Sequence, residues 1–171
     1  MARAAIVLLH DNRVALISRV RRGLQYFLFP GGHVEEGEAT GVAAAREALE
    51  ELGLYVRVGA LAATVQLLAT PGDGPEGRPQ YYFWAETVSG EFGTGLGAEL
   101  SSPAESASGS YTPVWLPLGD FPAADIRPRA LADALATRTF SPTSTPLEIV
   151  ETLPQPAVAS HPSRFEWKRT N

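Results

Sequence analysis

A single 23-residue run, GHVEEGEATGVAAAREALEELGL at residues 32–54, constrains this chain more than any other part of it. In a helix with about 100° per residue, Glu47, Glu50 and Glu51 fall on one face, and Gly53 ends the helix. Three like charges on one face repel one another, and hard divalent cations relieve that repulsion because they prefer oxygen ligands. The run therefore predicts a loop–helix–loop that binds Mg²⁺, with Mn²⁺ as a substitute.

The helix is expected to begin near Thr40, as the N-cap, and to run to Leu52. The stripe opposite the carboxylates is expected to face the core: Val42, Ala45, Leu49 and Leu52. The alternative interpretation is that the glutamates simply form the solvent-exposed face of the helix, where Arg46 and Glu50 are an i,i+4 ion pair. The glycines that bound the run favour the metal site over that reading.

The spacing of a glycine, five residues, a glutamate, seven residues and Arg-Glu-Ala-Leu-Glu-Glu-Leu-Gly-Leu resembles the signature box of the Nudix hydrolase superfamily, MutT-like pyrophosphohydrolases included. Every fixed position matches, and Ala48 places a small side chain where the pattern has a bulky apolar one. Residues 29–32 resemble the family's strand-to-loop entry, and residues 111–118 its late core strand. The resemblance covers residues 3–137. It implies an α/β/α sandwich with a mixed central β-sheet.

The resemblance also implies residue roles. Arg46 would orient Glu47 or pair with Glu50, and Glu47 is the first candidate for the general base. Some family members use a glutamate from a distant loop, for which Glu99, followed by Glu105, is the candidate. Four oxygen ligands are implied for the metal: the backbone carbonyl of Gly32 and the carboxylates of Glu47, Glu50 and Glu51.

Contacts to the substrate are expected just before and inside the box. Arg19 and Arg21 are two residues apart in a strand, so their side chains point to the same side, where either can bind a phosphate. Each arginine taken alone is also explained as a solvated surface charge. Gly31 and Gly32 are the other candidates. Aromatic residues of the strands either fill the core or offer a base-stacking surface: Tyr26, Phe27, Phe29, Tyr81, Phe83 and Trp84.

The reaction implied is hydrolysis of a phosphoanhydride bond in a small nucleotide. By elimination, a nucleoside tri- or diphosphate, including oxidised or noncanonical ones, is the leading substrate, and ADP-ribose or a nucleotide sugar comes next. Pro71 is a weak hint of ADP-ribose. A related isomerase needs a cysteine, which the chain lacks. A non-catalytic nucleotide sensor on the same fold is the alternative from another class, but sensors typically lose carboxylates that this chain keeps.

Bulk properties agree with an enzyme of this kind. The 171 residues suit one domain, and a net charge of −5 disfavours binding to a nucleic-acid polymer. The sequence has no apolar stretch long enough to span a membrane, and the absence of cysteine makes a cytoplasmic location the default. Monomer and homodimer both stay open.

The expected elements follow the chain in a simple order. A second helix is expected at residues 127–137, and a Gly/Ser-rich loop at 89–110 is read as a lid or binding loop. The Nudix domain is expected at 1–137, followed at 138–171 by a proline-rich extension that packs on the domain or on a partner, with 146–151 its only strand candidate. Strands are expected at residues 3–10, 13–20, 25–29, 56–69, 80–88 and 111–116.

Overall fold

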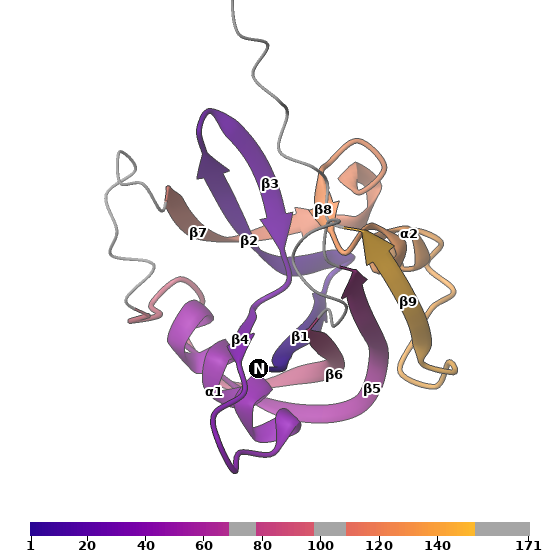
Figure 1. Ribbon diagram of the computed structural model, residues 1–171. Helices are drawn as coiled ribbons and strands as arrows, with labels where there is room; N and C mark the ends of the chain where they lie inside the picture. The colour runs from indigo at the N-terminus through magenta and orange to yellow at the C-terminus, as the bar shows by residue number, and fades with distance from the viewer. Residues whose placement is uncertain (69–77, 98–108, 153–171) are drawn as a thin grey trace, which may run out of the picture.

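The computed structural model describes residues 1–68, 78–97 and 109–152 (Figure 1). These residues form a mixed β-sheet, two α-helices and one short 3-10 helix. The elements are β1 (Arg3–His10), β2 (Arg13–Arg21), β3 (Leu24–Leu28), β4 (Gly31–His33), α1 (Thr40–Leu52), β5 (Leu54–Leu68), β6 (Pro79–Gly90), β7 (Ser110–Pro117), η1 (Leu118–Asp120), β8 (Ile126–Arg127), α2 (Arg129–Ala136) and β9 (Leu147–Thr152).

The sheet runs in the order β8-β3-β2-β1-β6-β5-β9, with β4 paired to β1 and β7 paired to β2. The hairpin strands β1 and β2 pair only beside their turn, at Leu9↔Val14 and His10↔Arg13. Beyond that point they diverge, because β3 continues the pairing of β2 while β4 pairs with the start of β1. The divergence places the functional site between the two halves of the sheet.

Alternation along β1 divides the core into two layers. Ala4, Ile6 and Leu8 pack with α1 on one face, whereas Ala5 and Val7 pack on the other face with residues of α2. The two helices therefore cover opposite faces of the mixed sheet, as in Figure 1. This is the predicted α/β/α sandwich.

Helix α1 spans the predicted residues but turns a different face to the sheet. Val42, expected inside, is 60% exposed, and the buried positions are mostly alanines: Ala43, Ala44, Ala48 and Leu52. At about 100° per residue, Glu47 and Glu51 lie on the same side as Ala44 and Ala48. The small side chains allow the helix to lie close on the sheet, and they bring these two carboxylates toward it.

Other boundaries differ from the sequence predictions. The N-cap of α1 is Ala39 rather than Thr40, because the extended backbone conformation lies at Ala39 and Thr40 is already helical. The second helix begins at Arg129 rather than at residue 127, since Arg127 pairs with β3 in the unpredicted strand β8. Strand β4, at Gly31–His33, was also missed, because glycine is a poor strand former and only pairing with β1 holds it extended.

Part of the expected C-terminal extension belongs to the sheet. The strand predicted at residues 146–151 is confirmed as β9, which pairs in parallel with β5 and buries Ile149. Residues 153–171 lie outside the described part of the chain. Neither of the two described helices is long and apolar enough to cross a membrane.

The C-terminus of α1 is fastened by the loop that follows β6. Gly53 adopts a left-handed conformation (φ 76°, ψ 17°), and its N–H bonds to the carbonyl of Leu49. Two further carbonyls at this end accept hydrogen bonds from the loop, Leu52 from Gly93 and Glu50 from Gly97, both with N–O distances below 3.0 Å. The loop therefore satisfies two of the terminal carbonyls at the helix end that carries the carboxylates.

We predict that Gly53→Ala lowers the free energy of unfolding by more than Gly23→Ala, measured by chemical denaturation. Both glycines have φ of +76°, but a Cβ at Gly53 would strike Thr94 and the carbonyl of Glu91, whereas Gly23 faces open space. The Gly23 variant should cost about 1–2 kcal/mol for the left-handed backbone alone, and the Gly53 variant about 1–3 kcal/mol more for the steric conflict. Equal losses would contradict the close packing described for this helix end.

Candidate active site

Two glycines of β4 bring backbone and carboxylates together. The N–H of Gly31 donates a 2.7 Å hydrogen bond to Oε2 of Glu51. A Cβ at Gly31 would collide with Ala4 on the neighbouring strand, and a Cβ at Gly32 would collide with the Glu47 carboxylate. Only residues without a side chain allow α1 to hold its carboxylates this close to β4.

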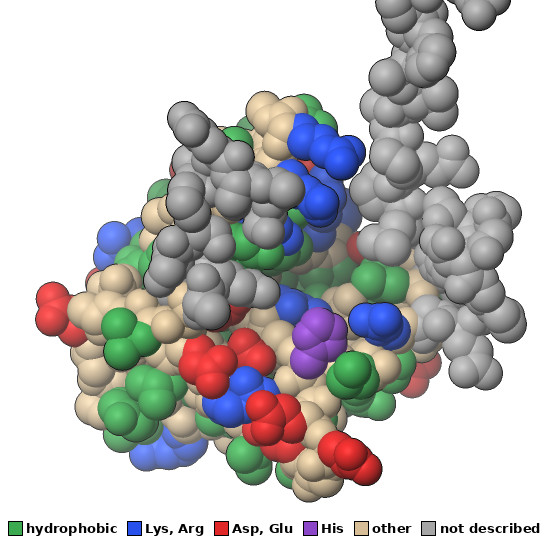
Figure 2. Space-filling model, turned by 60° about the vertical axis from the view of Figure 1, so that its left-hand side comes forward, with side chains coloured by type: hydrophobic (Ala, Val, Ile, Leu, Met, Phe, Trp, Pro, Cys, Tyr) green, Lys and Arg blue, Asp and Glu red, His purple; other side chains and the backbone are tan. Residues whose placement is uncertain are grey.

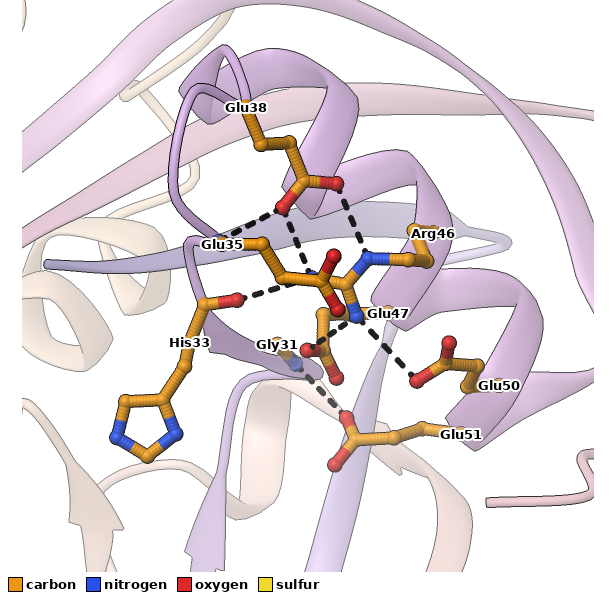
Figure 3. A network of polar contacts seen from close by, with 8 residues as sticks. All are labelled: Gly31, His33, Glu35, Glu38, Arg46, Glu47, Glu50 and Glu51. Carbon is orange, nitrogen blue, oxygen red and sulfur yellow. Dashed lines mark hydrogen bonds and ion pairs between the residues drawn. The ribbon is translucent and has the colours of Figure 1, made fainter. Parts of the chain in front are cut away.

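Arg46 is the centre of the acidic cluster (Figure 3). Its Nε and Nη2 donate to the two oxygens of Glu38 at 3.0 Å each, and Nη2 also donates to the carbonyl of His33 at 2.9 Å. Its Nη1 contacts Oε1 of Glu47 at 2.9 Å and Oε2 of Glu50 at 3.4 Å. One guanidinium thus joins the loop before α1 to two carboxylates of the helix, using one oxygen of each.

The carboxylates differ in their electrostatic environment. The hydrogen bond from Arg46 lowers the pKa of Glu38, and the same bond raises the pKa of Arg46. Burial raises the pKa of Glu47, despite the opposing effect of Arg46. The side chain of Glu47 is 13% exposed, compared with 48% for Glu50. A cation nearby would therefore offset the cost of burying the negative charge of Glu47.

The donor set fits a hard divalent cation. The carboxylates of Glu47, Glu50 and Glu51 line one cavity of about 310 Å³ together with Gly32. Within the described residues no three acidic or histidine side chains form a closed cage, since Arg46 and the Gly31 N–H each hold carboxylate oxygens. Mg²⁺ does not need such a cage, because it usually binds one or two carboxylates and completes its shell with water and substrate phosphates.

Three cavities form a continuous row that begins at the acidic cluster. The 310 Å³ cavity shares Gly31, Glu51 and Tyr111 with a middle cavity of about 200 Å³. The middle cavity shares Phe29 with a larger one of about 790 Å³. Figure 2 shows the acidic side chains on one face beside a hollow in which basic side chains gather.

Arg3 lines all three cavities and was not predicted from the sequence. It is the first residue of β1, and its Nη2 donates to the carbonyl of Phe29 at 3.0 Å. Its neighbours across the strands are His33 on β4 and Gln80 on β6. The sequence offered one signal for Arg3, namely a charged residue at the start of an otherwise apolar strand. That signal does not locate the cavities, because they form only when distant strands pack together.

A ladder of alternating tyrosine and arginine side chains crosses β7, β2, β3 and β8. Arg19 lies opposite both Tyr111 and Tyr26, with its Cζ 3.9 Å and 5.7 Å from the two ring centroids. Arg127 stacks on Tyr26 at 4.3 Å. Arg19 and Tyr111 line the middle cavity, whereas Tyr26 and Arg127 line the large one. The ladder offers positive charge and aromatic faces along the row of cavities.

Comparison with known protein families identifies the family to which this chain belongs. The family model for the NUDIX domain matches residues 1–135, which include β4, α1 and the acidic cluster. The chain belongs to the NUDIX family. It is accordingly a hydrolase of acid anhydrides in phosphorus-containing substrates, and members of this family generally use a divalent metal ion such as Mg²⁺.

Solved Nudix structures share the fold at low sequence identity. A NUDIX hydrolase from Nitrosomonas europaea matches with a TM-score of 0.60 and 21% identity, over 88% of this chain and 78% of that one. The MutT protein from Bacillus halodurans matches at 0.59 and 18%, over 89% and 90%. An ADP-ribose pyrophosphatase from Streptococcus suis matches at 0.53 and 13%, over 86% and 97%. No curated protein matches the chain.

The Nudix site gathers most of the residues selected from the sequence. Glu38 hydrogen-bonds within its loop by accepting a bond from the N–H of Glu35. Arg19 lines the middle cavity, but Arg21 is exposed at the end of β2 and lines none of these three cavities. Glu99, Glu105 and Pro71 lie outside the described residues.

The Glu38–Arg46 pair should make stability depend on pH in the acid range. In the unfolded chain Glu38 titrates near its ordinary value of 4.5, whereas in the folded protein its pKa is lower. The stabilisation is therefore complete above pH 4.5 and is lost as the pH falls through the lower folded pKa. We expect the melting temperature of Glu38→Gln to fall less steeply than that of the wild type between about pH 5 and pH 3.

The matched control is Glu36→Gln, which removes an exposed carboxylate two residues away that takes no part in the network of Figure 3. This variant should keep the wild-type slope. Identical slopes for all three proteins would show that the Glu38–Arg46 contact does not stabilise the fold.

Proposed function

We propose that this Nudix hydrolase cleaves a phosphoanhydride bond in a nucleoside diphosphate derivative, with Mg²⁺ as cofactor. The leading substrate is a nucleoside tri- or diphosphate, including oxidised or noncanonical ones. The observation that supports this most strongly is the row of cavities, which leads from the carboxylates past Arg3 into a largely apolar space of about 790 Å³. Such a row has room for phosphates at one end and a nucleoside at the other.

The acidic end would hold the metal through the Glu47, Glu50 and Glu51 carboxylates and the carbonyl of Gly32. When bound, a divalent cation neutralises phosphate oxygens and lowers the pKa of a coordinated water. Arg46 positions two of the carboxylates by its contacts with Glu47 and Glu50. The protein's own contribution at this end is a set of oxygens that Arg46 and the N–H of Gly31 hold in position.

Glu47 is the proposed general base. It lies in the same cavity as the other carboxylates, and its side chain is only 13% exposed, so bulk water competes little for its oxygens. Glu99 stays the alternative base. Arg3 and Arg19 both line the middle cavity, where they can pair with phosphate oxygens and stabilise charge as the bond breaks.

The nucleoside would occupy the large cavity. Leu28, Phe29 and Ile126 provide apolar walls, and Tyr26 presents an aromatic ring held by the guanidinium of Arg127. A volume of about 790 Å³ lies in the range of sites for drug-sized ligands. The same size admits larger groups, so ADP-ribose and nucleotide sugars stay the second proposal, and a nucleotide sensor the third.

A panel assay separates these proposals. We expect release of phosphate or pyrophosphate from nucleoside tri- or diphosphates with Mg²⁺, and no release in EDTA. Higher kcat/KM for ADP-ribose or a nucleotide sugar would move the assignment to the second proposal. Thermal stabilisation by nucleotides without turnover of any compound would identify a sensor instead.

Glu47→Gln tests the assignment of the base and ligand. The amide keeps the size of the side chain and can still accept the bond from Arg46, so the fold should survive, while kcat should fall by about 10²–10⁴-fold. Circular dichroism and thermal melting check the fold. As a control, Glu86→Gln removes an exposed carboxylate on β6 and should leave kcat unchanged. Near-normal turnover of the Glu47 variant would refute the assignment.

A further inference from the structure

Strand β9 forms part of the wall of the large cavity, although it lies beyond residues 1–135, which the family model matches. In the parallel pairing with β5, Ile149 lies beside Val65 and Glu151 beside Leu67. Ile149 is buried in the core, and alternation brings Glu151 to the same side of the strand, where it lines the cavity. This chain therefore adds a charged residue to the cavity from its C-terminal extension.

The carboxylate of Glu151 is held in place by α2. Its Oε1 accepts a 3.0 Å hydrogen bond from the N–H of Ala130, in the first turn of the helix. The N-terminus of a helix favours a negative charge, so this contact stabilises the ionised form. One oxygen thus anchors the group, and the carboxylate has a fixed position at the cavity wall.

The neighbours of Glu151 are also polar. Gln80 and Tyr82 of β6 line the same cavity, and the Tyr82 hydroxyl donates a 2.6 Å hydrogen bond to Oε1 of Gln80. Burial raises the pKa of Tyr82 to about 12, with Arg3 opposing the rise and Glu151 adding to it. Tyr82 therefore stays a neutral hydroxyl and lies within electrostatic reach of Arg3 and of Glu151.

The large cavity is lined by charges of both signs. Arg127 is paired with Asp125, and Arg129 with Asp133, whereas Glu151 presents its negative charge to the cavity from β9. A carboxylate repels a phosphate and accepts hydrogen bonds from O–H or N–H groups. A nucleoside carries such donors in the hydroxyl pair of its sugar and in the amino group of its base.

We propose that Glu151 accepts a hydrogen bond from the nucleoside part of the substrate and is a specificity-determining residue that β9 adds to the Nudix site. The inference rests on the proposed function, because it places the nucleoside in the large cavity. A ligand without the matching donor would leave a desolvated carboxylate without its partner, and such a mismatch discriminates strongly between ligands. The donor is either a sugar hydroxyl or a base amino group.

The test uses Glu151→Gln in the full chain. The carbonyl of the glutamine can still accept the hydrogen bond from the N–H of Ala130. Its amide N–H₂ group then points toward the nucleoside, where it meets the hydroxyl or amino donor instead of accepting a bond from it. Glu148→Gln, which changes an exposed carboxylate on the same strand, is the control. Binding of AMP, 2′-deoxy-AMP and IMP is measured by calorimetry in EDTA, and thermal melting checks that both variants are folded.

We expect Glu151→Gln to weaken AMP binding by about 10–100-fold and the Glu148 variant to bind as the wild type does. Weaker wild-type binding of 2′-deoxy-AMP than of AMP identifies the sugar hydroxyl as the donor, and weaker binding of IMP identifies the base amino group. Equal affinities of Glu151→Gln and wild type for AMP, or no binding of AMP to the wild type, would overturn the inference.

Hydrolysis separates this inference from the function on which it rests. With the substrate preferred in the panel assay, Glu151→Gln should raise KM by about the same factor while kcat changes less than about twofold. A wild-type protein that hydrolyses nucleotides, with a variant of unchanged KM, would overturn the role of Glu151 alone. Binding that depends on Glu151 in a protein that hydrolyses no member of the panel would overturn the proposed function alone.

Discussion

The site depends on one partly buried electrostatic arrangement, the guanidinium of Arg46 among three carboxylates. Glu38, Glu47 and Glu50 each bond to it, and the carbonyl of His33 holds it from the end of β4. Without this cation, three negative groups would meet in a partly buried space, where repulsion is weakly screened. The α1 N-terminus has no side-chain cap, so the Glu38–Arg46 contact also helps to join the loop to the helix. The same interaction therefore serves stability and the geometry that we propose for metal binding.

The second constraint is the divergence of β1 and β2. Because the hairpin strands pair only near their turn, the two halves of the sheet separate, and the residues between them line cavities instead of filling a core. Arg3 stands at this opening, between the acidic cluster and the large cavity. Strand β9 then extends the sheet beyond the part of the chain that the family model matches, and brings Glu151 into the cavity wall. Fold and proposed specificity are connected through this strand.

Much of this architecture follows from local patterns. The box spacing predicted α1 to within one residue of its start, and alternation predicted the long strands and the segment that became β9. What failed depended on tertiary packing. The predicted rotation of α1 was wrong because Val42 is the more hydrophobic residue, yet the positions that pack against the sheet are mostly alanines. Strand β4 carries no propensity signal and strand β8 is only two residues long, and both exist through pairing with β1 and β3. Arg3 and Glu151 belong to the cavities only because distant strands become neighbours, which no spacing along the chain encodes.

A crystal structure of the protein with Mn²⁺ and a non-hydrolysable nucleoside triphosphate would test the central claim most directly. Manganese can be located by its anomalous scattering, independently of the protein density. The account predicts a manganese peak in direct coordination with oxygens of Glu47, Glu50 or Glu51. It also predicts phosphates beside Arg3 and the nucleoside in the large cavity. A bound nucleotide with no manganese among these carboxylates, or with its phosphates away from α1, would contradict it.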